Sequence, residues 1–262
     1  MSAGTVLLSV RAVSKRFGGL AAVDGVSFDA PKGKIFGVIG PNGAGKSTLF
    51  SLISGLAPLS DGTVFFDGSD MGAVPAHGRS AIGMTRTFQI VRQFGHLSVI
   101  DNVMLGGHTR MSSGFMASLL RLPAVLDENR TLRNLSMEWL AFVGLAQRAS
   151  DLASHLPHGQ QRLLEIARAM VVGPRLLMLD EPAAGLNGAE TVNLLEILRK
   201  INAQGTAILI VEHDMKFIMS LCDRIVVLDH GARIAEGTPI EIRRDPAVIE
   251  AYLGKKAIDA AG

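Results

Sequence analysis

The residues whose chemistry is easiest to infer form a glycine-rich stretch that ends in a lysine and two hydroxyl side chains. An apolar segment, Ile35–Ile39, precedes this stretch, and a segment with helical spacing follows it. Glycines allow a tight loop whose backbone N–H groups point inward, and the N-terminus of the following helix adds a partial positive charge. The pattern predicts a phosphate-binding loop, in which Lys46 reaches the β- and γ-phosphates of a nucleotide and Ser47 binds Mg²⁺. The predicted loop comprises Gly40, Pro41, Asn42, Gly43, Ala44, Gly45, Lys46, Ser47 and Thr48. A dinucleotide site is the alternative for such a turn, and the pair Lys46-Ser47 argues against it.

Two adjacent acids, Asp180 and Glu181, supply the second half of a predicted hydrolytic site. They follow the apolar run Leu176–Leu179, as expected for carboxylates at the end of a buried strand. A phosphate-binding loop needs a further ligand for its metal, so Asp180 is predicted to hold Mg²⁺ through water. Glu181 is the candidate to orient and polarise the attacking water. Adjacent acids can also serve only as a helix cap, but the phosphate-binding loop favours the metal interpretation.

These side chains need a scaffold, and the hydrophobic pattern predicts alternating strands and helices. Some of the predicted strands do not alternate apolar with polar residues, which is typical of parallel sheets covered on both faces. The predicted strands are Ile35–Ile39, Thr63–Phe66, Met84–Phe88, Leu176–Leu179, Ala207–Val211 and Ile225–Leu228. The predicted helices are Lys46–Leu56, Gln160–Val172, Glu190–Ala203 and Met215–Cys222. Alternation of this kind indicates an α/β fold.

Two segments depart from that alternation. Short strands separated by Gly and Pro near the N-terminus predict an antiparallel β layer beside the main sheet. These strands are Val6–Val10, Val26–Asp29 and Thr63–Asp67. The middle of the chain shows no convincing strand, and its leucines recur at helical spacing. We therefore predict a single domain over 1–262, with a core over 1–93 and 170–254, an inserted α-helical subdomain over 94–169 and a tail over 255–262.

The order of motifs along the chain resembles that of the ATP-binding cassette (ABC) ATPases. Gln89 and the pair Gly159-Gln160 lie between the phosphate-binding loop and the two acids, and His213 follows the predicted strand Ala207–Val211. The resemblance covers almost the whole chain, from Leu8 to about Leu253. It implies a P-loop NTPase (RecA-like) parallel core sheet that binds ATP and Mg²⁺.

The resemblance also implies roles for residues outside the phosphate-binding loop. Gln89 is expected to contact Mg²⁺ or the attacking water and to sense a membrane partner. His213 is expected to contact the γ-phosphate and to steady the catalytic arrangement. Phe17 matches the aromatic residue that stacks on adenine, and Val23 is expected to line the same surface.

The family pairs two cassettes head to tail, so a helix start with His158, Gly159 and Gln160 is expected to face the ATP of a second chain. This chain departs from the usual Ser-Gly-Gly-Gln, because Pro157 stands where the family serine bonds the γ-phosphate. Proline offers neither a hydroxyl nor an N–H group. We hypothesise that His158 and the Gly159 N–H group replace the lost contact. If His158→Ala leaves the ATPase activity and ATP-dependent dimerisation unchanged, His158 does not replace the lost contact. Asn187 replaces a common Asp and keeps its size and hydrogen bonding but not its charge.

Further segments narrow the resemblance to the ATPase subunit of bacterial branched-chain amino-acid importers. They are Arg16–Val23, Thr85–Gln89, Gly159–Arg168, Asp180–Asn187, Val211–Lys216 and Glu236–Gly254. Uptake of urea or another organic solute, and lipopolysaccharide export, are the alternatives within the family. A soluble ABC ATPase that moves nucleic acid or ribosomes typically carries two cassettes or a long coiled coil, and neither is seen here. A non-catalytic regulatory cassette is disfavoured because every catalytic residue type is present.

The composition is apolar, with a mean hydropathy of +0.30 and 19% charged residues. No membrane span is predicted, because the longest stretch without Asp, Glu, Lys or Arg is 14 residues, against about 20 for a span. The net charge of +2 is spread along the chain, which gives little support for nucleic-acid binding. The one cysteine, Cys222, excludes an internal disulfide and fits a reducing compartment.

The resemblance implies two transmembrane permeases as partners and, indirectly, a periplasmic or extracellular solute-binding protein. The chain is therefore expected on the cytoplasmic face of the inner membrane, held there by its permeases. Ile90, Val91 and Phe94 are the candidates for an apolar grip on a permease coupling helix. The largest exposed apolar patch is expected beside Gln89.

Overall fold

The computed structural model describes residues 5–87, 94–107 and 123–253 of the chain. Its larger sheet has six strands in the order β10-β9-β3-β8-β7-β6. Neighbouring strands run parallel, except that β10 is antiparallel to β9. The strands are β3 (Ile35–Ile39), β6 (Met84–Arg86), β7 (Leu176–Asp180), β8 (Ala207–Val211), β9 (Arg224–Asp229) and β10 (Ala232–Gly237). The predicted parallel sheet is confirmed, and β10 is a strand that the apolar pattern did not predict.

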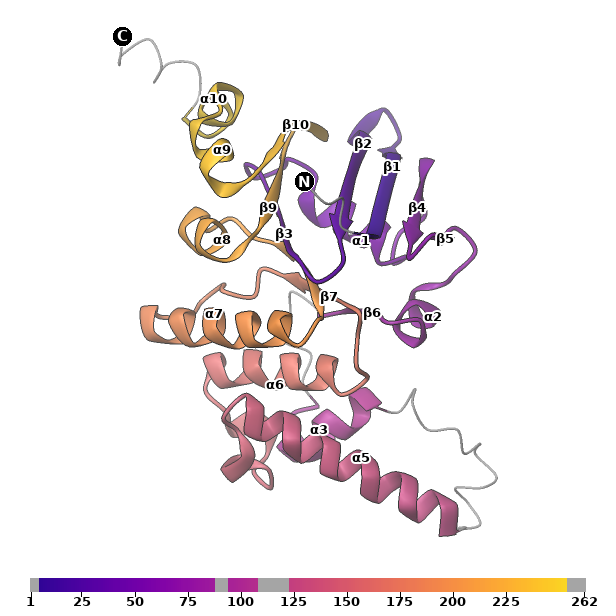
Figure 1. The fold of residues 1–262 in the computed structure, drawn as a ribbon, viewed down its shortest axis with the longest axis vertical. Helices are drawn as coiled ribbons and strands as arrows, with labels where there is room; N and C mark the ends of the chain where they lie inside the picture. Colours follow the sequence, from indigo (N-terminus) through magenta and orange to yellow (C-terminus); the bar gives the residue numbers. More distant parts are fainter. Residues whose placement is uncertain (1–4, 88–93, 108–122, 254–262) are drawn as a thin grey trace.

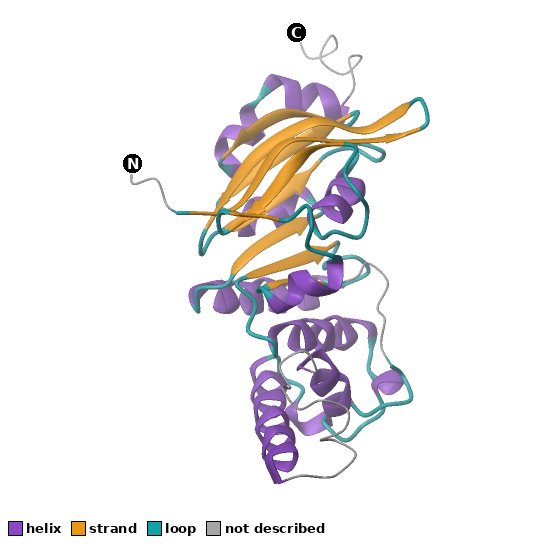
Figure 2. Cartoon of the chain, turned by 90° about the vertical axis from the view of Figure 1, so that its right-hand side faces the viewer, coloured by secondary structure: helices purple, strands orange, loops and turns teal. Residues whose placement is uncertain are grey.

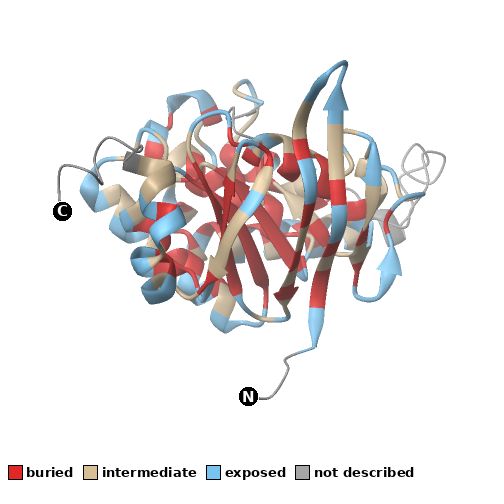
Figure 3. Ribbon diagram, turned by 90° about the horizontal axis from the view of Figure 1, so that it is seen from above, coloured by how far each residue is buried: buried red, intermediate tan, exposed pale blue. Residues whose placement is uncertain are grey.

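Both faces of this sheet are buried, as the continuous apolar strands predict. In β3, Ile35 and Ile39 pack into a cluster with the helices that cover one face, while Phe36 and Val38 pack into a second cluster on the opposite face. Figure 3 shows the central strands buried along their length, with exposed residues confined to the periphery. The two clusters account for most of the large aliphatic side chains in the described part of the chain.

The second cluster is closed by an antiparallel sheet in the order β2-β1-β4-β5. Its strands are β1 (Val6–Phe17), β2 (Leu20–Pro31), β4 (Asp61–Phe66) and β5 (Ser69–Asp70). This confirms the predicted antiparallel layer, although β1 and β2 are longer than expected. The turn at Gly18-Gly19 is tight enough for pairing to continue to Phe17 and Leu20, so polar residues beyond the apolar runs are included.

Six helices of the described chain accompany the two sheets outside the helical region. They are α1 (Lys46–Ile53), α2 (Ala76–Ala81), α7 (Gly188–Ala203), α8 (Met215–Leu221) and α9 (Pro239–Arg244), with α10 (Pro246–Leu253) following α9 near the end of the described chain. Helix α1 stops three residues short of the predicted Leu56, and Gly55 adopts a left-handed φ of 75° just beyond it. Proline at the first position and a capping box from Thr238 start α9, although its apolar pattern is too short to have predicted it.

The helices of the middle segment gather at one end of the molecule. They are α3 (Val99–Gly106), α5 (Pro123–Phe142) and α6 (His158–Met170), with single turns η2 (Ala146–Arg148) and η3 (Ala153–His155). Figures 1 and 2 show this group at the opposite end from α9 and α10, with α7 between α6 and the strands. The helical nature of this segment agrees with the prediction, whereas the domain boundaries stay a prediction. Within the described residues, no helix has the length and apolar character needed to cross a membrane.

Candidate functional site

The predicted phosphate-binding loop connects the end of β3 to the start of α1. Gly45 precedes α1 with a φ of 95°, and a Cβ atom there would lie 2.3 Å from the carbonyl oxygen of Ala22. Only glycine satisfies both conditions, so the loop can lie directly against β2. The loop borders a cavity of about 390 Å³, a volume typical of small-molecule sites. Its lining includes Asn42, Gly43, Ala44, Gly45, Lys46, Ser47 and Thr48, together with Glu181.

Lys46 is buried beneath this loop, with its ammonium group bound to the loop's own backbone. The Nζ atom donates hydrogen bonds to the carbonyl oxygens of Gly40 at 2.7 Å and Pro41 at 2.8 Å. Burial lowers the pKa of Lys46, and the nearby charge of Glu181 opposes that shift. The lysine is therefore held at the cavity by groups that a phosphate oxygen could replace.

Asp180 is the last residue of β7 and is 2% exposed. Its Oδ2 atom accepts a hydrogen bond from Nη2 of Arg86 on β6, 2.8 Å away. Burial raises the pKa of Asp180, while the guanidinium group of Arg86 opposes this. The Oδ1 atom is buried without a hydrogen-bond partner among the described residues. An unpaired carboxylate oxygen fits a metal ion, and Ser47 provides an exposed hydroxyl at the start of α1.

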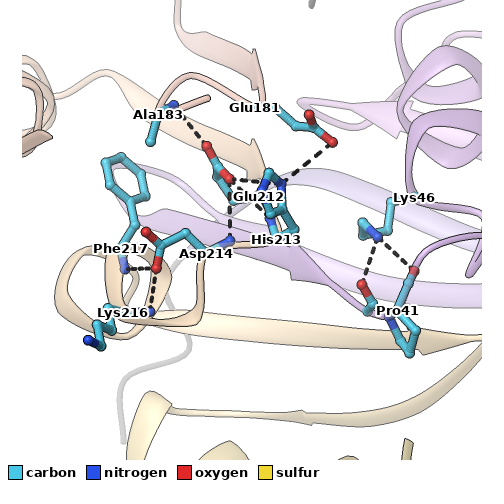
Figure 4. A network of polar contacts seen from close by, with 10 residues as sticks. Pro41, Lys46, Glu181, Ala183, Glu212, His213, Asp214, Lys216 and Phe217 are labelled. Carbon is cyan, nitrogen blue, oxygen red and sulfur yellow. Dashed lines mark hydrogen bonds and ion pairs between the residues drawn. The ribbon is translucent and has the colours of Figure 1, made fainter. Parts of the chain in front are cut away.

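Glu181 and His213 follow neighbouring strands and approach each other at the carboxyl edge of the sheet. The N–H group of Glu181 donates to the carbonyl oxygen of Val211, 2.9 Å away, and its φ of 47° turns the chain away from β7. Nδ1 of His213 lies 3.9 Å from Oε1 of Glu181 and 3.6 Å from Oε2 of Glu212. Figure 4 shows these three side chains together, with Lys46 nearby. The structure thus brings the predicted water-orienting acid and the predicted phosphate-contacting histidine to one place.

Two of the residues in this region were not predicted to have a role there. Arg86 binds Asp180 across 94 positions of sequence, and Glu212 accepts a hydrogen bond from Ala183, 29 residues away. Burial raises the pKa of Glu212, and three backbone N–H groups counteract that rise. The signal available in the sequence was a charged residue within or directly after an apolar run, but this pattern does not identify the partners.

The two residues expected at the adenine lie in different environments. Phe17 is 56% exposed at the end of β1, beside the β-turn that leads to Leu20, which lines the cavity. Val23 is fully buried in the cluster between the two sheets. The expectation that Val23 lines the adenine surface is therefore corrected, because its side chain is occupied by core packing. Phe17 remains available to a flat ligand.

The start of α6 lies apart from the cavity. His158, Gly159 and Gln160 are not among the residues that line it. A Cβ atom on Gly159 would lie 2.4 Å from Oε1 of Glu190, so this helix start packs closely on the start of α7. Oε1 of Gln160 accepts a hydrogen bond from Arg148 at 2.8 Å. In a single chain these three residues and the phosphate-binding loop form separate surfaces.

A groove of about 330 Å³ lies between β6, α3 and α6. Phe94, which is 47% exposed, and Leu105 contribute exposed apolar side chains to it. Gln89, Ile90 and Val91 lie outside the described residues, so the metal contact of Gln89 and the apolar patch beside it stay predictions. The groove is at the position expected for a grip between the core and the helical segment.

Comparison with known proteins gives consistent results along the chain. The family profile described as "ABC transporter" matches residues 23–184, and a profile described as "Branched-chain amino acid ATP-binding cassette transporter" matches residues 232–258. Two curated relatives are each 42% identical to this chain, over 95% of this chain and 98% of their own length. They are the high-affinity branched-chain amino acid transport ATP-binding proteins BraF of Pseudomonas aeruginosa and LivG of Escherichia coli. A solved ATP-binding cassette of an ABC transporter in its ADP conformation superimposes with a TM-score of 0.83 at 30% identity, covering 95% of this chain and 99% of that one.

Proposed function

The chain is an ATP-binding cassette of the ABC transporter family, and from this we propose that it powers the import of branched-chain amino acids by hydrolysing ATP. The observation that carries the hydrolytic part is the convergence of Lys46, Asp180, Glu181 and His213 at the carboxyl edge of one parallel sheet. Ligands of open α/β folds bind at this edge. Identity to importer subunits over nearly the whole chain supports the choice of solute.

Each of these side chains has a step in the proposed reaction. The backbone N–H groups of the loop and the ammonium group of Lys46 bind the phosphates and stabilise the charge that shifts during cleavage. Glu181 orients a water molecule for in-line attack on the γ-phosphorus, and His213 contacts the γ-phosphate beside it. Ser47 and Asp180 would hold Mg²⁺, which supplies further neutralisation of phosphate charge when bound.

The start of α6 lies apart from the cavity of its own chain. This supports an ATP site that is completed by the start of α6 from a second chain. His158, Gly159 and Gln160 of one subunit face the ATP of the other in the proposed head-to-tail dimer. The free N–H groups of a helix N-terminus suit an oxyanion there. ATP closes the dimer, and loss of the γ-phosphate contact opens it.

The groove beside Phe94 is the proposed contact with the membrane subunits. It lies between the sheet and the helical segment, so a helix held in it would contact both parts of the cassette. An apolar coupling helix from each of two permeases fits its exposed side chains. This contact holds the chain on the cytoplasmic face of the membrane, and the periplasmic or extracellular binding protein acts only through the permeases.

Uptake in intact cells tests this function. Deletion of the gene is expected to remove high-affinity uptake of labelled leucine, isoleucine and valine, and the wild-type gene is expected to restore it. Glu181→Gln is expected to restore no uptake at equal expression. If the deletion strain takes up leucine normally but loses uptake of urea or another organic solute, the transported solute is reassigned. If Glu181→Gln restores uptake, ATP hydrolysis by this chain is not the energy source.

A further inference from the structure

Glu212 is a buried carboxylate that lies outside the phosphate-binding loop and the metal site. It follows β8 directly, is 1% exposed and precedes His213 in the chain. Figure 4 shows its carboxylate between the backbone that follows Glu181 and the backbone that carries His213. Burying a charge is costly unless hydrogen bonds satisfy it. The identity of its donors therefore indicates what this residue holds.

The two carboxylate oxygens of Glu212 accept hydrogen bonds from two different loops. Oε1 accepts from the N–H group of Ala183 at 2.8 Å, in the loop that follows Glu181. Oε2 accepts from the N–H group of His213 at 3.0 Å and from that of Asp214 at 3.4 Å. A glutamine could accept on one side only, because its amide nitrogen is a donor that would face an N–H group. The carboxylate is thus the group that can join both loops.

His213 lies between this carboxylate and a fixed helix start. The side chain of the next residue, Asp214, caps α8 by accepting from two backbone N–H groups of its first turn, at 2.8 and 3.1 Å. The imidazole ring projects toward Glu181, with Nδ1 3.9 Å from its Oε1 atom. A displacement of Glu212 would therefore move the backbone of His213 and carry the ring with it.

The other loop leads to the surface proposed to face a second chain. The carbonyl oxygen of Ala184, next to Ala183, lies 3.3 Å from Nε2 of His158 at the start of α6. A Cβ atom on Gly185 would lie 3.2 Å from the same nitrogen. The loop over 183–187 is thus in contact both with the start of α6 and, through the N–H group of Ala183, with Glu212.

We propose that Glu212 is a positioning residue that couples the loop over 183–187 to His213. Its carboxylate keeps the backbone of Ala183 and the backbone of His213 at a set separation, so engagement of the loop by a second cassette places the imidazole at the γ-phosphate. This inference rests on the proposed hydrolysis, and it adds a residue that acts through His213 and does not touch ATP.

Steady-state hydrolysis by the full chain gives the first test, with Glu212→Gln. We expect kcat to fall about 10- to 100-fold, the size of effect that a misplaced catalytic group produces, while KM for ATP changes little because the phosphate-binding loop is intact. Glu165→Gln is the matched control, since Glu165 is also a buried glutamate but pairs with Arg162 on α6, and it should keep its kcat. Glu212→Asp, which keeps the charge on a shorter side chain, should give an intermediate kcat. A wild-type kcat in folded Glu212→Gln, or a matching loss in Glu165→Gln, would overturn the inference.

A double-mutant cycle with His213→Ala provides the second test, read by single-turnover hydrolysis of labelled ATP. If Glu212 acts through His213, Glu212→Gln should cause no further loss when His213 is already alanine. If the fold-losses in turnover of the two single variants multiply in the double variant, the coupling is overturned while the proposed hydrolysis stays in place. Wild-type turnover in His213→Ala alone would overturn the inference together with the proposed role of that histidine, so the two failures give different results.

Discussion

Arg86 illustrates how the chemistry of single residues depends on their burial. Its guanidinium group binds Asp180 with one nitrogen and donates to Oγ of Ser54 at 2.8 Å with another, while it lies 4.8 Å from the centre of the Phe50 ring. The Arg86 side chain is 12% exposed and that of Asp180 is 2% exposed, so water is a poor substitute for either partner. Because Arg86 occupies one carboxylate oxygen of Asp180, the other oxygen is the one that could bind the proposed metal ion.

Removal of this guanidinium should be far more costly than removal of an exposed one. Arg86→Met leaves Asp180 as an unpaired buried charge, and we expect a loss of about 3–5 kcal/mol in the free energy of unfolding. Arg11→Met breaks an exposed pair with Asp29 and should cost less than about 1 kcal/mol. Urea unfolding of both variants measures the difference. Equal losses would show that the Arg86–Asp180 pair contributes no more than a surface pair.

Cys222 allows a test of burial through its reactivity. It is buried against β3, and burial, with a smaller effect from Asp223, raises the pKa of its thiol. The thiolate is the reactive form, so we expect labelling by a thiol reagent at pH 8 to be slow in the native protein. Labelling should become fast in urea. A native rate equal to that of the unfolded chain would contradict the described packing.

Residues that belong to local motifs could be predicted from the sequence, while residues defined by distant contacts could not. The glycine-rich loop and the pair Asp180-Glu181 each occupy one continuous stretch, and the structure places both at the sheet edge. Arg86 and Glu212 have partners far along the chain, and only the strand order β8-β7-β6 brings them together. Val23 was wrongly expected at a surface because an apolar residue next to a site cannot be distinguished by sequence from one in the core.

At the scale of elements, the starts of two helices position the surface proposed to face a second cassette. Asn187 caps α7 by accepting from the N–H group of Glu190, whose side chain accepts in return from the Asn187 N–H group. The carboxylate of Glu190 also lies over Gly159 at the start of α6. One capping box thus fixes the start of α7 and limits the approach of α6.

Substitution of the cap tests this arrangement. Asn187→Ala should lower the free energy of unfolding by about 0.5–2 kcal/mol, because the N–H group of Glu190 loses its side-chain acceptor. Asn187→Asp keeps the acceptor and should be close to wild type. Asn193→Ala, an exposed position in the same helix, is the control and should be neutral or slightly stabilising. Chemical denaturation compares the three, and a neutral Asn187→Ala would exclude the cap as a source of stability.

Helix and strand identities followed from the apolar pattern, but their ends and the shorter elements did not. Ala207–Val211 and Ile35–Ile39 agree with the predicted strands at both ends, since a buried parallel strand is apolar throughout. β10 has an intermediate pattern of burial at the edge of the sheet. Its pairing with β9 is a tertiary contact that the apolar pattern does not encode.

For the whole molecule, the large apolar side chains of the described residues are divided between two cores and twelve exposed positions. The two hydrophobic clusters lie on opposite faces of the parallel sheet. Among the described residues, exposed Phe94 and Leu105 share the groove between the sheet and the helical segment, whereas exposed Ile240 lies on α9. Phe94 therefore represents the proposed permease contact, and Ile240 represents an exposed apolar residue outside it.

Membrane association should depend on the groove and not on exposed apolar surface in general. Phe94→Asp is expected to abolish recovery of the chain with membranes that contain its permeases, while the ATPase rate of the isolated chain stays near wild type. Ile240→Asp is the control and should still be recovered. Sedimentation of membranes followed by immunoblotting measures both. Equal recovery of Phe94→Asp and wild type would place the permease contact elsewhere.

Hydrolysis by the purified chain with Glu181→Gln tests the central proposal most directly. The substitution keeps the size of the side chain and removes the charge that is proposed to orient the attacking water. We expect the variant to bind ATP with Mg²⁺, to form an ATP-dependent dimer by light scattering, and to lose at least about 100-fold in kcat. Turnover near that of the wild type, with ATP binding and dimer formation intact, would contradict the assignment of Glu181 and with it the proposed hydrolytic mechanism.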